Sequence, residues 1–303
     1  MSQRVFTFPF LFFLVLFVIS FSVWYGSEWS DDHVDYLRVI SEGRITKRVR
    51  CPMPHFVLVH GYGGGAWQWY KIRALLETYG YKVTCLDLKS AGIDRSDACE
   101  VRSFEEYNKP LINFMANLSD HEKVILVGHS AGGLSVTDAS RKFGKKIGVA
   151  VYVAGTMLEH GFMTDQDKKD GIPYYALSNL NNYKCVSGLD QPSTTLKHSR
   201  YQINANIGPQ EEEVLGLMLH RSGPPLKAIV GAQFEGDGAD DVPRVYIMTR
   251  YDHVLRPAQQ AAMIRKWAPL KTYVVESGHA PLFSDPFVLS GLLVKAANFI
   301  ECN

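Results

Sequence analysis

The chain has 303 residues, of which 46% are hydrophobic and 21% are charged, and a chain of this size can bury one large core. Its formal net charge is only +1 and it has no long cluster of lysine and arginine, so the composition gives no electrostatic basis for nucleic-acid binding. We therefore expect one folded α/β domain and no nucleic-acid partner.

The first part of the chain, residues 1–26, differs in kind from the rest. No charged residue occurs over residues 5–25, where phenylalanine, leucine, valine and isoleucine dominate. About 20 such residues in a helix would cross a bilayer core of roughly 30 Å. We therefore expect a single-pass N-terminal anchor and a membrane localisation, with secretion after signal-peptide cleavage at Ser22 as the alternative. Residues 27–54 are polar and predict a linker.

The folded domain, residues 55–303, is predicted to open with a strand at 55–60, the loop Gly61-Tyr62-Gly63-Gly64-Gly65 and a helix over 66–79. Such a loop can bind phosphate, but it lacks Gly-Lys-Ser/Thr and the glycine spacing of dinucleotide-binding proteins. A loop whose main-chain N–H groups stabilise an oxyanion is the better interpretation, and Tyr62 is the expected donor.

A second strand is expected at 82–88, and a helix at 103–118 that begins with the capping box Ser103-Phe104-Glu105-Glu106. Asp87 and Asp94 follow the strand. Carboxylates that close a strand or a turn usually bond the nearby main chain, so we do not assign them a catalytic role.

The strand Val124–His129 runs directly into Gly128-His129-Ser130-Ala131-Gly132, and a helical pattern follows as far as Phe143. A strand, Gly-x-Ser-x-Gly and a helix in this order predict a nucleophile elbow, in which a tight and strained turn exposes the serine. Ser130 is therefore the expected nucleophile. The N–H of Ala131, the residue after it, is the expected second oxyanion donor.

Another strand is expected at 147–154, and strands that alternate with helices predict a mostly parallel sheet with helices on both faces. Residues 155–240 break this alternation. They are rich in glycine, proline, asparagine and glutamine, have helical fragments such as 211–220 and lack a strong strand. The segment is too long for a plain loop, and we expect an inserted cap over the site.

The core pattern resumes with strands at 242–249 and 270–276, and with helices at 257–267 and 286–300. Asp252 and His279 each follow one of these strands, at the carboxyl ends where α/β sheets place their sites. The chain order Ser130, Asp252, His279 is typical of an α/β-hydrolase triad. Five cysteines without a close pair, and no metal-ligand spacing, lead us to expect no metal and no cofactor.

Four blocks of the chain, 55–67, 83–94, 123–133 and 244–252, resemble the plant methylesterases, which are relatives of the hydroxynitrile lyases in the α/β-hydrolase superfamily. The resemblance covers most of residues 55–303 and is weakest in the cap. It implies hydrolysis of methyl esters of small hormone-like acids such as salicylate, jasmonate and indole-acetate. A small-molecule ester is then the partner, and a homodimer is left open.

The same resemblance implies the roles of the site residues: Ser130 as nucleophile, His279 as general base, Asp252 as its orienting partner, and the N–H groups of Tyr62 and Ala131 as oxyanion donors.

Two departures bear on the alternatives within this fold. The lyases typically have threonine after the first-loop histidine and lysine after the triad aspartate, whereas this chain has Gly61 and His253. These residues disfavour cyanohydrin cleavage. A small-molecule receptor without turnover is a third interpretation, but the triad and the glycine loop occur together, which favours an enzyme.

Overall fold

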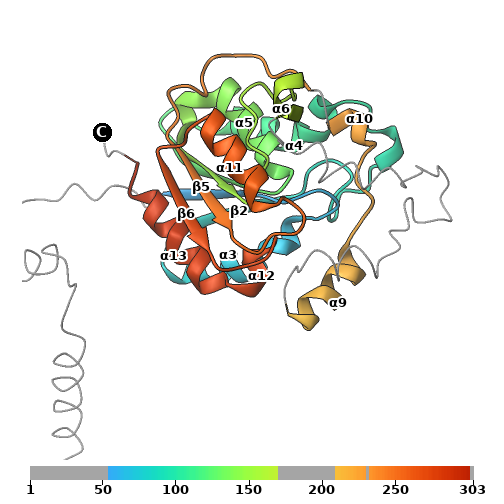
Figure 1. Cartoon of the computed structure of the whole chain (residues 1–303), viewed down its shortest axis with the longest axis vertical. Helices are drawn as coiled ribbons and strands as arrows, with labels where there is room; N and C mark the ends of the chain where they lie inside the picture. Colours follow the sequence, from blue (N-terminus) through green and yellow to red (C-terminus); the bar gives the residue numbers. More distant parts are fainter. Residues whose placement is uncertain (1–53, 170–208, 230–231, 301–303) are drawn as a thin grey trace, which may run out of the picture. The chain divides into compact units, whose positions relative to one another are not determined.

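A parallel sheet lies at the centre of the computed structural model, which describes residues 54–169, 209–229 and 232–300 (Figure 1). Within these residues the sheet has six strands in the order β2-β1-β3-β4-β5-β6, and each neighbouring pair is parallel. The strands are β1 (His55–Val59), β2 (Lys82–Leu86), β3 (Val124–His129), β4 (Ile147–Val153), β5 (Arg244–Thr249) and β6 (Lys271–Val275). The expected α/β fold with a parallel sheet is confirmed.

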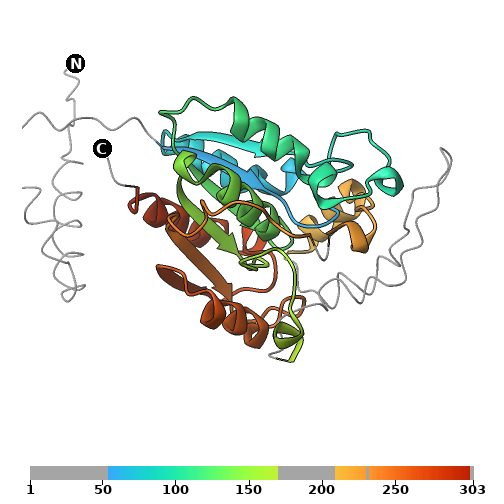
Figure 2. The same ribbon diagram turned by 90° about the horizontal axis from the view of Figure 1, so that it is seen from above.

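Helices cover both faces of this sheet, as Figure 1 and Figure 2 show. One face carries α4, α5 and α11, and the other carries α3, α12 and α13, as their buried side chains indicate. The bounds are α3 (Tyr70–Thr78), α4 (Phe104–Asn117), α5 (Gly132–Phe143), α11 (Pro257–Lys266), α12 (Pro281–Ser284) and α13 (Pro286–Ala297). Covering both faces of the sheet buries every side of the central strands.

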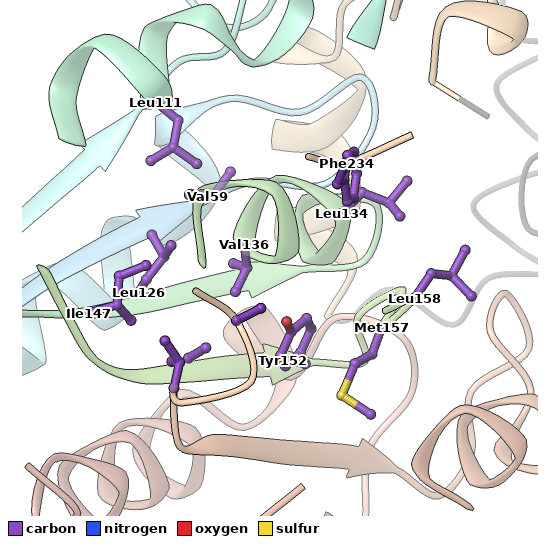
Figure 3. Packing of buried hydrophobic residues seen from close by; sticks show 14 of the residues in the cluster. Val59, Leu111, Leu126, Leu134, Val136, Ile147, Tyr152, Met157, Leu158 and Phe234 are labelled. Atoms are coloured by element: carbon purple, nitrogen blue, oxygen red, sulfur yellow. The ribbon is translucent and has the colours of Figure 1, made fainter. Parts of the chain in front are cut away.

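The apolar runs of the sequence are explained by this double burial. In β3, Val124 and Leu126 face the core under α4 and α5, while Ile125 and Val127 face the core under α3 and α13. Side chains of a strand alternate between faces, so a strand buried on both faces is apolar at consecutive positions, as residues 124–127 are. Figure 3 shows the first core, where Leu111 and helix side chains of α5 meet strand residues. Each fully buried leucine or valine contributes about 1.5–3 kcal/mol.

The order of the strands determines which loops meet at the carboxyl edge. The chain leaves β1 for β2 on one side and returns through α4 to β3 on the other side, so β1 and β3 pair directly, with Val59 opposite Gly128. Likewise β5 and β6 pair, with Thr249 opposite Val275. The loop after β1 therefore adjoins the turn after β3, and the loops after β5 and β6 are neighbours.

The predicted elements differ from the structure mainly at their ends. The helix expected at 66–79 is divided into a 3₁₀ turn, η1 (Ala66–Trp69), and α3. At the start of α4 the Ser103 hydroxyl accepts from the Glu106 N–H at 3.1 Å, but the Glu106 carboxylate accepts from the N–H of Arg102 rather than of Ser103. The cap is therefore only half of the expected box. The sequence analysis also missed the short helix α12.

Between β4 and β5 the described residues form α6 (Asp165–Lys169), α9 (Gln210–Leu219) and α10 (Leu226–Ile229), and none of these residues forms a strand. Two ion pairs join this inserted segment to the helices of the core. Asp167 of α6 pairs with Lys266 of α11, and Glu212 of α9 pairs with Lys71 of α3. The helix expected at 211–220 corresponds to α9.

The expected membrane localisation has to be corrected. Among residues 54–169, 209–229 and 232–300, the structure has no helix that combines the length and the apolar character needed to cross a membrane. The prediction rested on the length of one apolar run, which sets the capacity to span a bilayer and nothing more. Residues 1–26, with the signal-peptide alternative, and residues 27–53 of the linker lie outside the described residues. The single-pass anchor and the membrane partner are withdrawn, and the domain boundaries stay predictions.

Candidate active site

The turn between β3 and α5 holds Ser130 in a strained conformation. Its φ is +53°, in the left-handed region that non-glycine residues rarely adopt, which costs of order 1–3 kcal/mol. Main-chain hydrogen bonds hold this conformation: the Ser130 N–H donates to Val153 O at 3.2 Å, and Ser130 O accepts from Thr156 N–H at 2.9 Å. The strain turns the side chain out at the carboxyl edge of the sheet, as the sequence motif predicts.

Two glycines lie where the main chain approaches this turn closely. A Cβ on Gly132 would lie 2.5 Å from the carbonyl oxygen of His60, and a Cβ on Gly61 would lie 3.0 Å from the Cβ of Ser130. The loop after β1 therefore packs directly against the elbow. This contact brings the expected oxyanion loop beside the expected nucleophile.

Ser130, His279 and Asp252 form one hydrogen-bonded series. The Ser130 Oγ lies 2.9 Å from His279 Nε2, and His279 Nδ1 lies 2.8 Å from Asp252 Oδ2. Asp252 and His279 are buried, at 2% and 5% exposure. A carboxylate can only accept, so Nδ1 carries the proton of the neutral ring and Nε2 is free to accept from the serine hydroxyl. The structure thus brings together all three side chains that the sequence analysis singled out.

The carboxylate of Asp252 is held in its ionised form by its neighbours. Burial raises its pKa, but His279, the N–H of Leu255 and the hydroxyl of Thr249 outweigh that effect and leave the pKa below its ordinary value. Oδ1 accepts from the N–H groups of Val254 and Leu255, each at 2.8 Å. The buried negative charge is therefore fully bonded.

The expected oxyanion donors belong to the two segments that meet at Ser130. Tyr62 belongs to the loop after β1, and Ala131 precedes the first residue of α5. Neither of their main-chain N–H groups donates a hydrogen bond to any of the residues that the structure describes. Donors left free beside a nucleophile are suited to the oxygen of a tetrahedral intermediate.

His129 and Gln260 support the triad, and the sequence analysis did not identify either. The ring of His129 is buried, and its Nε2–H donates to the main-chain oxygen of His279 at 2.8 Å. Gln260 of α11 donates from Nε2 to Asp252 Oδ2 at 3.2 Å and accepts the N–H of Thr249 at 3.1 Å. The only sequence signal for the role of His129 was its position inside the elbow motif. The periodicity of helix α11 gives no signal for the role of Gln260.

The electrostatics of His129 indicate a structural ring. Burial, followed by the charge of the neighbouring His279, lowers the pKa of His129 to about 3. The ring is therefore neutral at physiological pH and acts as a donor to the loop of His279 rather than as an acid or base. The ring centroids of the two histidines are 4.9 Å apart.

His60 shapes the loop after β1 in a similar way. Its Nε2 accepts the N–H of Leu88 at 3.1 Å, so Nδ1 carries the proton and donates to Gly61 O at 2.7 Å. Burial lowers the pKa of His60 and keeps the ring neutral. This ring joins the end of β2 to the start of the glycine loop.

The carboxylates of Asp87 and Asp94 accept hydrogen bonds from main-chain N–H groups, as expected from the sequence. Asp87 accepts the N–H of Ala66 at 2.7 Å, and Asp94 accepts those of Ser90 and Ser96, each at 2.9 Å. Neither carboxylate is part of the hydrogen-bonded series of Ser130. Among the described residues no group of three or more histidine, cysteine or acidic side chains is arranged to hold a metal ion.

An elbow serine bonded in series to a histidine and a carboxylate, at the carboxyl edge of a parallel sheet, is the arrangement that defines α/β hydrolases. Residues 56–290 of the chain match the alpha/beta hydrolase family, and the chain therefore belongs to this family.

Relatives within this family include methylesterases. The chain is 45% identical over 254 residues to Methylesterase 17 from Arabidopsis thaliana, a match that covers 80% of this chain and 91% of the relative. It is 37% identical to Pheophorbidase from Raphanus sativus, over 82% of this chain and 95% of the relative. The crystal structure of the methylesterase protein MES16 from Arabidopsis superposes with a TM-score of 0.69 at 36% identity, over 82% of this chain and all of that one. The resemblance to plant methylesterases is confirmed.

Proposed function

We propose that Ser130, His279 and Asp252 hydrolyse the methyl esters of small, hormone-like carboxylic acids. The protein is a carboxylic ester hydrolase of the methylesterase group, as its relatives indicate. The observation that supports these residues as its catalytic groups is the series of hydrogen bonds from the Ser130 hydroxyl to the His279 ring and from that ring to Asp252.

The reaction follows from the donors and acceptors of this series. His279 Nε2 takes the proton of the Ser130 hydroxyl as its oxygen attacks the ester carbonyl, and Asp252 stabilises the imidazolium that forms. The negative oxygen of the tetrahedral intermediate accepts from the N–H groups of Tyr62 and Ala131. The imidazolium then protonates the departing methoxide, and methanol leaves an acyl-enzyme on Ser130.

Water completes the cycle at the same groups. His279 takes a proton from the water as its oxygen attacks the acyl carbonyl, and returns that proton to Ser130 as the acid leaves. No step needs a metal or a cofactor. The absence of a side chain at Gly61 favours this path over cyanohydrin cleavage, because residue 61 has no hydroxyl to offer.

The Ser130→Ala variant tests the proposal. Purified full-length chain is incubated with methyl salicylate, methyl jasmonate and methyl indole-acetate, and methanol and acid are measured over many turnovers. We expect release well beyond one equivalent from the wild type and at least a 10³-fold loss in the variant, because the attacking oxygen is gone. Ser140→Ala is the matched control, since that serine is buried within α5 and donates to Val136 O at 2.8 Å.

Three results would contradict the proposal: turnover that survives in Ser130→Ala, release that stops near one equivalent in the wild type, or cyanide from a cyanohydrin without methanol from any ester. The second would favour a receptor and the third a lyase. The homodimer that the sequence left open is tested by sedimentation equilibrium, in which the mass of a single chain would contradict it.

A further inference from the structure

The sequence of the glycine loop after β1 places little restriction on its main-chain dihedral angles. Four of the five residues in 61–65 are glycines, and Tyr62 alone has a side chain. Glycine has more conformational freedom than any other residue, so such a loop does not fix the direction of an N–H group by itself. Hydrogen bonds from His60, Arg221 and Gly92 also reach the main chain of the loop, but the side chain of Tyr62 is the only side chain of residues 61–65 that can anchor it.

The inserted segment binds the side chain of Tyr62. The Tyr62 hydroxyl donates to Pro224 O at 2.5 Å, across 162 residues of sequence, and the tyrosine ring packs against Gly223. Burial raises the pKa of Tyr62 above its ordinary range, so the phenol keeps its proton and stays a donor at every working pH. The contact is thus a hydrogen bond from the loop to the segment between α9 and α10, with the phenol as its donor.

Arg221 fixes the same part of the inserted segment to the core. Its N–H donates to Gly63 O at 3.0 Å, and its guanidinium donates to the main-chain oxygens of Gly92, at 3.2 Å, and Asp94. Gly63 has a φ of +70°, and a Cβ there would collide with the ring of His220. Residues 220–224 therefore bind both the glycine loop and the loop after β2.

We propose that Tyr62 is a positioning residue that acts through its own main chain: its hydroxyl, bound to Pro224 O, sets the direction of its N–H toward the oxyanion. The inference rests on the proposed function, in which that N–H is an oxyanion donor. Residues 220–224 then belong to the working oxyanion hole although none of them touches the reacting atoms. The oxyanion forms only when the serine adds to the ester carbonyl, so the effect is expected on the transition state and not on the bound substrate.

The Tyr62→Phe variant removes only the hydroxyl. We expect kcat for a methyl ester to fall about tenfold with KM changed less than about twofold, because one misdirected donor weakens the oxyanion and not the substrate complex. The affinity for a trifluoromethyl ketone, which adds the serine and carries an oxyanion, should fall by the same factor as kcat/KM. The affinity for the product acid should stay the same.

Tyr246→Phe is the matched control. Its hydroxyl also donates to a main-chain oxygen, that of Gly155, at 2.8 Å, but it is not attached to the glycine loop. We expect this variant to lose some thermal stability while kcat and the affinity for the trifluoromethyl ketone stay within about twofold of wild type. A loss of trifluoromethyl ketone affinity equal to that of Tyr62→Phe would overturn the inference.

Arg221→Gln separates positioning through the inserted segment from a direct role of the phenol. It removes the guanidinium bonds to Gly92 and Asp94 and leaves Tyr62 intact, and we expect the same pattern of losses as in Tyr62→Phe. In the double variant the two losses should be less than multiplicative, because both act on one contact. Fully multiplicative losses would overturn the proposed coupling.

The outcomes also distinguish the inference from the function on which it rests. If the wild type turns over the ester and Tyr62→Phe keeps both its kcat and its affinity for the trifluoromethyl ketone, the inference alone is refuted. Wild type without turnover, or Ser130→Ala with turnover, refutes the proposed function. If Tyr62→Phe fails to fold, Arg221→Gln decides: unchanged kcat and trifluoromethyl ketone affinity refute the inference.

Discussion

Replacing Asp252 by asparagine tests the central hydrogen bond of the site with the smallest change of shape. Both carboxylate oxygens of Asp252 face donors: two main-chain N–H groups at Oδ1, and His279, Thr249 and Gln260 at Oδ2. An asparagine amide must turn its NH₂ toward one of these two groups. The direction it chooses decides the effect on the reaction.

The structure favours the direction that inactivates the site. A main-chain N–H cannot become an acceptor, whereas the His279 ring can move its proton to Nε2 and the Thr249 hydroxyl can rotate. The NH₂ group of the asparagine is therefore expected at the Oδ2 position, where it donates to His279 Nδ1. The proton then lies on Nε2, which can no longer accept from Ser130.

The expected loss is large in rate and modest in stability. The same exchange in a serine protease triad lowers kcat about 10⁴-fold, and four factors of ten correspond to about 5.4 kcal/mol in the barrier. In the folded variant the asparagine NH₂ and Gln260 Nε2 are both donors, so their hydrogen bond is lost. One unsatisfied buried group usually lowers the free energy of unfolding by about 1–3 kcal/mol. The variant should therefore fold while being almost inactive.

The assay combines three measurements on the same preparation. Methanol release gives kcat, urea unfolding gives the free energy of unfolding, and ¹⁵N NMR of the imidazole reports which nitrogen of His279 carries the proton. Asp94→Asn is the control, because that carboxylate bonds Ser90 and Ser96 near β2 and is not part of the hydrogen-bonded series of Ser130. A kcat within tenfold of wild type, or a proton still on Nδ1 in an inactive variant, would refute the argument.

Two further variants test the packing of the elbow and of the inserted segment. Gly132→Ala places a methyl group 2.5 Å from a main-chain oxygen of the loop after β1. We therefore expect the free energy of unfolding to fall by about 1–3 kcal/mol and kcat to be reduced. A fully stable variant would show that the elbow tolerates a Cβ. Burial raises the pKa of Asp167, but the bond from the Lys266 ammonium and those from Thr164 outweigh it, so the pKa of the folded state lies below the ordinary value of about 3.9. Stability from this carboxylate is therefore present above about pH 4 and is lost as the pH falls through the folded-state pKa. Asp167→Asn should lower the free energy of unfolding at pH 7 and approach wild type in strong acid, and an equal difference at both pH values in urea unfolding would contradict the assignment.

Much of the fold was predictable because its signals are local. The strand at Val124–His129, the Gly-x-Ser-x-Gly turn and the helix to Phe143 follow one another within twenty residues, and each shows in its own composition and periodicity. Their order with Asp252 and His279 was enough to single out the three side chains that the structure joins by hydrogen bonds. The ends of elements were less predictable, as the expected capping box at Ser103 shows: the Glu106 carboxylate accepts from the N–H of Arg102 and not from that of Ser103.

The amino-acid sequence by itself determined the alternation of strands and helices, the elbow and the identity of the three side chains, because these depend on neighbours along the chain. Tertiary structure alone decided that His129 donates to the main chain of His279, that Gln260 supports Asp252, and that Tyr62 reaches Pro224. Two of these three contacts join residues 150 or more positions apart, and the third joins helix α11 to the loop after β5. Such pairs form only when the register of the sheet brings its loops together, and no local propensity encodes that register.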